Sequence, residues 1–200
     1  MNKKKLNEYS SFITKALTDF VASIPESKLS KARDPIVESE ILIAKASWKS
    51  ATVSGGLALV PGPYGMATVV PDMIAVWKVQ GQLIADIAAV YGKTEHLNQE
   101  TLLYCLFKNT ESALFKDIFV RVGEKFLVKR MTLQYMEELL VELGFRVTQK
   151  VVGKALGRWI LFIGAAAVAW YTKRETRQAG EAAKEFFSVE IEEIEIGELK

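Results

Sequence analysis

The chain has few of the residues that build disulfides and metal sites. Its 200 residues include one cysteine, Cys105, and one histidine, His96. A single cysteine excludes an internal disulfide, which fits a reducing compartment. A single histidine excludes a histidine-rich metal site, and no Cys, Asp or Glu near His96 has the spacing of metal ligands. Cys105 stands among leucines, so we expect it to be a buried small hydrophobe.

The signatures of common enzymes are also missing. The sequence contains neither a Gly-x-x-x-x-Gly-Lys-Ser/Thr phosphate loop nor a Gly-x-Ser-x-Gly elbow. Asp72 and Asp86 are the only carboxylates between Ser50 and Gly92. On one helix they would lie about 21 Å apart, too far for paired acid–base chemistry. We therefore expect no enzyme activity, no catalytic residue, no cofactor and no bound metal.

The chain also has little excess of positive over negative charge. The net charge is +2, which gives no reason to expect nucleic acid as a partner. Lys3–Lys5 could open a secretion signal, but Glu8, Lys15 and Asp19 interrupt the apolar run that would have to follow. We therefore expect a cytoplasmic protein.

What the chain does have is a long run without charge. Ser50–Pro71 contains no charged residue and is broken by Pro61-Gly62-Pro63, which forbids one straight helix. The run predicts two short apolar helical arms around a turn, with Tyr64 at the tip. Either the arms are the core of a helical bundle, or Ala51–Val70 dips into a bilayer, where a tyrosine at the lipid–water interface is favoured.

A second apolar segment, Trp159–Tyr171, has thirteen residues without charge. As a helix it would span roughly 20 Å, less than the about 30 Å hydrocarbon core. Trp159, Trp170 and Tyr171 bracket it with aromatic rings, and basic residues flank both ends. This arrangement is typical of an interfacial or half-inserted helix. The alternative is a central core helix.

Four basic residues precede this segment at intervals of four: Arg146, Lys150, Lys154 and Arg158. On a helix they lie along one broad face, which would attract anionic headgroups. The alternatives are a solvated face or a dock for the acidic tail Glu190–Glu198.

Most of the chain follows helical spacing, which predicts an all-α fold: a compact multi-helix bundle around the Pro/Gly-broken apolar hairpin. We expect one domain over residues 1–187 and an acidic tail over 188–200 that is frayed or loosely docked, with a short strand as the alternative. Helix-start signals are Asp34-Pro35, Pro71-Asp72, Asn98, Thr110 and Thr132, and Gly92 is a stop signal. The helix after Thr110 would carry Phe115, Phe119, Val122 and Phe126 on one side. The helix after Asp34 would pack through a seam of Val37, Ile41, Ala44, Trp48, Ala51 and Gly55.

The Pro-Gly-Pro turn, Pro71-Asp72 and Ala85-x-x-Ala88-x-x-Tyr91-Gly92 together resemble the EcsC family. Pro61, Pro63, Gln80, Tyr91 and Gly92 are also similar to the YcjF-type helical domain of bacterial GTPase-associated proteins. The resemblance covers roughly residues 48–93. It implies a bacterial, all-helical protein associated with membrane or transporter systems, or a regulatory helical domain.

These observations leave two functional hypotheses. The first is a non-enzymatic peripheral membrane protein at the inner face of the cytoplasmic membrane, linked to a transporter or an envelope or stress system. Its partner would be the membrane surface or a membrane protein. The second is a soluble helical protein-interaction or regulatory module. Residues predicted to contact lipid are Pro61, Pro63, Tyr64, Arg146, Lys150, Lys154, Arg158, Trp159, Trp170 and Tyr171.

Overall fold

The computed structural model describes residues 3–57, 65–156 and 160–194. Helices make up 75% of the chain, which confirms the predicted helical character. The helices are α1 (Lys3–Val21), α2 (Pro35–Leu57), α3 (Gly65–Tyr91), the short 3-10 helix η1 (Thr94–His96), α4 (Gln99–Phe115), α5 (Leu133–Leu156) and α6 (Ile160–Ser188). The strands among the described residues are β1 (Phe119–Val122), β2 (Lys125–Lys129) and β3 (Glu190–Ile194).

The local signals at several helix ends are confirmed. The side chains of Asp34, Asn98 and Thr132 each accept a hydrogen bond from the N–H three residues further on, at 3.1, 2.8 and 3.2 Å. α3 ends as predicted at Gly92, whose φ of 67° favours glycine. The N–H groups of Gly92 and of the next residue return to α3 carbonyls at 2.9 Å each, a Schellman termination.

The predicted helix start at Pro71-Asp72 is wrong. α3 begins at Gly65 and continues through Pro71, so Asp72 lies inside the helix instead of capping it. Proline inside a helix removes one hydrogen bond and normally kinks or breaks the helix. Val70 is buried and Met73 and Ile74 pack against the core, so tertiary packing of this apolar helix overrides the local signal.

The fold is not purely all-α, because strands follow Phe115. The predicted helix after Thr110 is therefore wrong beyond that residue. Phe119–Val122 and Lys125–Lys129 form an antiparallel hairpin, in which Val122 pairs with Lys125 across a two-residue turn. Gly123 in this turn has a φ of 60°. Phe126 and Val128 are buried and the residues between them are more exposed, the alternation of a strand with one covered face.

Part of the acidic tail is ordered as the third strand. Glu190–Ile194 pairs in parallel with β2, which gives the sheet order β1-β2-β3. The prediction of a frayed end is therefore wrong for these residues, and the alternative of a short strand is correct. Side-chain ion pairs support the pairing: Lys125 lies 3.3 Å from Glu190, and Arg130 lies 3.0 Å from Glu193.

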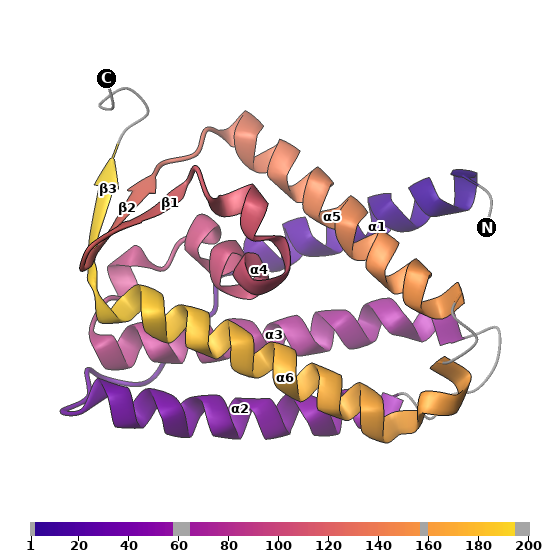
Figure 1. Cartoon of the computed structure of the whole chain (residues 1–200), viewed down its shortest axis with the longest axis horizontal. Helices are drawn as coiled ribbons and strands as arrows, with labels where there is room; N and C mark the ends of the chain where they lie inside the picture. The colour runs from indigo at the N-terminus through magenta and orange to yellow at the C-terminus, as the bar shows by residue number, and fades with distance from the viewer. Residues whose placement is uncertain (1–2, 58–64, 157–159, 195–200) are drawn as a thin grey trace.

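The helices form two groups (Figure 1). α2, α3 and α6 pack side by side along the length of the molecule, and α1 and α5 form a second pair above them. Close approach within the first group depends on Gly180 of α6. A Cβ on this glycine would lie 2.5 Å from Ile43 of α2 and 3.0 Å from Leu83 of α3.

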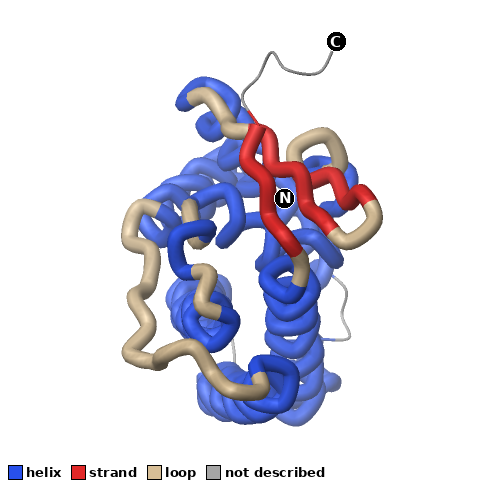
Figure 2. The backbone as a smooth tube through the Cα atoms, turned by 90° about the vertical axis from the view of Figure 1, so that its left-hand side faces the viewer, coloured by secondary structure: helices blue, strands red, loops and turns tan. Residues whose placement is uncertain are grey.

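The small sheet covers one end of the helices, as Figure 2 shows from that side. An aromatic cluster joins the sheet to α4 and α6. Tyr104 stacks on Phe119 with ring centroids 4.1 Å apart, and Phe186 lies 5.1 Å from Phe126. Contacts of this kind add to the burial of apolar area, so this end is a conventional packed core.

Candidate functional site

The structure brings the two charge-free segments to the same end of the molecule. α2 finishes there, α3 and α6 begin there, and α6 runs antiparallel along α2 (Figure 1). We call this end, formed by residues 51–57, 65–70 and 160–171, the apolar end. Its residues come from three helices that are far apart in the sequence.

Two tryptophans near the apolar end are exposed to solvent. Trp48 of α2 is 63% exposed and Trp170 of α6 is 62% exposed. The Lys173 ammonium lies 3.5 Å from the ring centroid of Trp48, and the Arg174 guanidinium lies 5.9 Å from that of Trp170. Tryptophan rings are mostly covered in folded proteins, so two exposed rings beside cations make this surface the candidate site.

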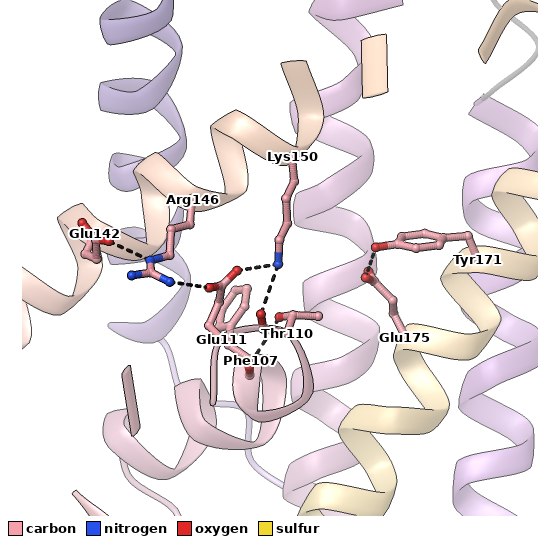
Figure 3. Close-up of polar contacts among 8 residues, drawn as sticks. All are labelled: Phe107, Thr110, Glu111, Glu142, Arg146, Lys150, Tyr171 and Glu175. Carbon is pink, nitrogen blue, oxygen red and sulfur yellow. Dashed lines mark hydrogen bonds and ion pairs between the residues drawn. The ribbon is translucent and has the colours of Figure 1, made fainter. Parts of the chain in front are cut away.

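The charges near these rings are mostly positive. Residues 41–57 and 160–177 contain five basic side chains and one acidic side chain, Glu175. Tyr171 donates a hydrogen bond to Glu175, and burial together with this bond raises the pKa of the tyrosine (Figure 3). We call the five cations the basic collar: Lys45, Lys49, Lys173, Arg174 and Arg177.

Arg146 and Lys150, the two residues of the predicted stripe whose side chains the structure describes, are paired within the protein (Figure 3). Glu111 of α4 is only 6% exposed and binds two of the stripe's cations: Arg146, at 3.1 Å, and Lys150. Hydrogen bonds to Glu142 and to Glu111 raise the pKa of Arg146. The backbone of α4 leaves helical geometry at Glu111, with φ −137° and ψ 39°.

The alternative that the acidic tail docks on this stripe is wrong for the described residues. Glu190 and Glu192 lie near Lys125, and Glu193 lies near Arg130 and His96. Those partners belong to β2, the residue that follows it and η1, so the described part of the tail is held at the sheet and not along α5.

Of the other predicted site residues, five lie outside the described residues: Pro61, Pro63, Tyr64, Arg158 and Trp159. Lys154 lies in the last turns of α5. Trp170 and Tyr171 lie at the apolar end and are exposed, whereas Arg146 and Lys150 face α4.

Trp48 is a candidate that sequence reasoning placed on the wrong face. The predicted packing seam of α2 is exposed at Val37, Ile41, Ala44 and Trp48, and buried at Ala51. The face that packs on α3 and α6 carries four buried serines beside Ile43 and Ala51. The serines are Ser39, Ser47, Ser50 and Ser54, and their own helical spacing was the available signal.

Asp72 lies at the apolar end, on the side of α3 that faces α2. Burial raises the pKa of its carboxyl, and the nearby Ser54 hydroxyl opposes that shift. The Oδ1 atom of Asp72 and the hydroxyl of Ser47 are covered and have no hydrogen-bond partner among the described residues. The interior of this end is therefore more polar than the aromatic core at the opposite end.

Within the described ranges, no group of three His, Cys, Asp or Glu side chains could hold a metal ion. Cys105 is completely covered, and burial raises the pKa of its thiol, which disfavours the thiolate. One described helical stretch, Val70–Tyr91, is long and apolar enough to cross a membrane. This stretch is the core helix α3, with 61% of its apolar window buried in the protein.

Comparison with known proteins adds no relative: no family model, no curated protein and no solved structure matches this chain.

Proposed function

We propose that this chain is a non-enzymatic peripheral membrane protein that binds anionic lipid surfaces through its apolar end. The observation that carries the proposal is the pair of exposed tryptophans, Trp48 and Trp170, beside Lys173 and Arg174 where the charge-free segments meet. The resemblance to the EcsC family agrees with this function. It adds a location at the inner face of the cytoplasmic membrane and a link to a transporter or an envelope or stress system.

The chemistry of this end matches a lipid–water interface. Tryptophan prefers the headgroup level, because its ring is apolar and its N–H remains hydrated. Lys and Arg keep their charges in water while their alkyl stems cover apolar surface. An anionic leaflet attracts each nearby cation by about 1 kcal/mol, so the five cations of the basic collar supply a large electrostatic share of the binding.

The lengths of the segments favour partial insertion over a complete span. The charge-free part of α6, Ile160–Thr172, would extend about 20 Å, and a bilayer core measures about 30 Å. Lys49 of α2 and Lys173 of α6 mark the depth at which charge begins on each helix. We expect the basic collar to rest among the headgroups and the apolar end to enter the acyl region beyond them.

Vesicle flotation tests this function directly. We expect the protein to float with vesicles that contain anionic lipid and much less with purely zwitterionic vesicles. Trp170→Ser should lower the bound fraction. Tyr135→Ser, which removes an exposed aromatic ring at the start of α5, should leave it unchanged. Failure of the wild-type protein to float with either vesicle would refute membrane binding.

A soluble helical interaction module is the second candidate function. One observation favours it: the outward side of α2 carries an apolar stripe that begins at Val37, well before the apolar end. The two functions differ in the flotation experiment, where an interaction module would remain with the unbound protein.

A further inference from the structure

α2 exposes several apolar side chains on the side that faces away from the rest of the fold. Its inward side carries four buried serines together with the buried Ile43 and Ala51, while Val37 is 54% exposed and Ile41 is 45% exposed. α3 and α6 lie on the inward side, and no described helix or strand packs against the other side, at the lower edge of Figure 1, where the Lys173 side chain of α6 lies over the Trp48 ring. Apolar side chains aligned on one open helix face indicate a partner surface.

The spacing of the stripe fits another helix. Val37, Ile41, Ala44 and Trp48 follow one another at intervals of four, three and four residues, the repeat by which two helices interlock side chains. The stripe covers about 16 Å of helix, or three turns. Ala44 in its middle allows close approach of a facing backbone, and Trp48 supplies a large ring at one end.

The charges beside the stripe change sign along the helix. The first half of α2 and its cap carry acidic side chains, including Glu38, and the second half carries Lys45 and Lys49. Among the described residues, neither Glu38 nor Lys45 has an ion-pair partner within its own chain. A parallel pair of such helices would place like charges together, whereas an antiparallel pair places acid against base at both ends.

We propose that the apolar stripe of α2 binds the same stripe on a second copy of this chain in an antiparallel, two-fold symmetric pair. With the axis between Ile41 and Ala44, each Ile41 faces Ala44 of the second copy, and Val37 faces Trp48 of the second copy. Glu38 then lies beside Lys45 of the second copy, and symmetry forms this ion pair twice. The pairing covers Val37, Ile41 and Trp48, which the monomer exposes.

The proposed pair has a geometric consequence for membrane binding. Antiparallel α2 helices direct the two apolar ends away from each other, so one flat bilayer cannot receive both. The dimer is therefore the form of the protein in solution, and the apolar end of one dissociated copy meets the lipid. Self-association itself needs no lipid and is tested without it.

Sedimentation equilibrium of the full chain, over a range of concentrations and without lipid, tests the proposal. We expect a reversible dimer for the wild-type chain and a monomer for Ile41→Glu. Val141→Glu places the same charge at an exposed apolar position of α5 and should remain dimeric. Circular dichroism of both variants should show unchanged helix content, because both positions are exposed.

A charge exchange tests the antiparallel direction. Lys45→Glu should weaken the dimer about tenfold or more, because it replaces two attractions with two repulsions. The double variant Glu38→Lys with Lys45→Glu should recover wild-type affinity, since every pair is restored with its signs reversed. A monomeric wild-type chain, or a dimeric Ile41→Glu variant, would overturn the proposal. A double variant no tighter than Lys45→Glu alone would overturn the antiparallel pairing.

Discussion

Removing two cations of the basic collar should weaken binding to anionic vesicles selectively. We choose Lys49 on α2 and Arg174 on α6, which are exposed and lie on the two helices that frame the apolar end. Lys49 has no ion-pair partner among the described residues, so its replacement by alanine breaks no salt bridge within the fold. The variant Lys49→Ala with Arg174→Ala should therefore keep its stability.

The magnitude follows from the number of charges. Each basic residue near an anionic leaflet contributes about 1 kcal/mol, so the double variant should lose about 2 kcal/mol, or about 30-fold in partition coefficient. Raising the salt concentration should weaken vesicle binding by the wild-type protein. It should also bring the partition coefficients of the wild type and the double variant closer together, because the Debye length falls from about 10 Å at 0.1 M to about 3 Å at 1 M. Binding to zwitterionic vesicles should be almost the same for both proteins.

The assay is co-sedimentation with sucrose-loaded vesicles at increasing fractions of anionic lipid. Lys28→Ala with Lys116→Ala is the matched control, since both lysines are exposed and lie away from the apolar end. The control should bind within about twofold of wild type, as expected for charges more than a Debye length from the lipid. Equal losses in the two double variants would show that net charge, and not the basic collar, drives binding, and would refute the reasoning.

Three further predictions concern the stability of the fold. Burial raises the pKa of Asp72, so its charged form is less stable in the folded protein than in the unfolded chain. Asp72→Asn should therefore raise the urea midpoint at neutral pH but not in acid, where the wild-type carboxyl is already protonated. Burial alone would raise the pKa of Glu185, but hydrogen bonds from two cations lower it on balance. Its stabilising contribution is present above the ordinary carboxyl pKa and lost as the pH falls below it, so Glu185→Gln should reduce the loss of stability in acid titrations. Gly144→Ala would place a Cβ 2.0 Å from the Thr14 hydroxyl and 3.0 Å from its Cα, so thermal melts should show destabilisation by about 1–3 kcal/mol.

Features set by a few neighbouring residues were predictable from the sequence. Asp34, Asn98 and Thr132 cap the helices that their spacing indicated, and Gly92 ends α3 in a left-handed conformation. A cap bonds to an N–H two or three residues away, so its geometry depends little on the rest of the fold. Pro71 is the exception, because the packing of α3 outweighs its local preference.

The sheet was not predictable from the same kind of signal. Phe119, Val122 and Phe126 fit helical spacing as well as they fit two strands joined by a turn. The third strand favours the two strands over the helix, since Phe126 pairs with Ile191, which lies 65 residues later in the chain. No local window contains that partner, and Gly123 was the one nearby sign of a turn.

The buried face of α2 was mispredicted because two faces of this helix have regular helical spacing. Apolar spacing selected the face of Ile41 and Trp48, but close packing selected the face of the small serines. Gly180 brings α6 near α2 at Ile43, and at such short separations a serine fits where a larger side chain would not. Small residues therefore contribute to the choice of the buried side of α2, where they lie beside the apolar Ile43.

Several departures from ordinary soluble design lie at or near the apolar end of the molecule. The aromatic core around Tyr104 at the sheet end obeys the usual rules of packing. The other end contains Pro71 inside a helix, a carboxyl at Asp72 whose pKa is raised by burial, and two exposed tryptophans. Each feature lowers stability in water, and proteins keep such features mainly where function requires them. One lipid surface would cover both tryptophans at once. Two unrelated packing defects would not explain why both exposed rings lie near the same end of the molecule.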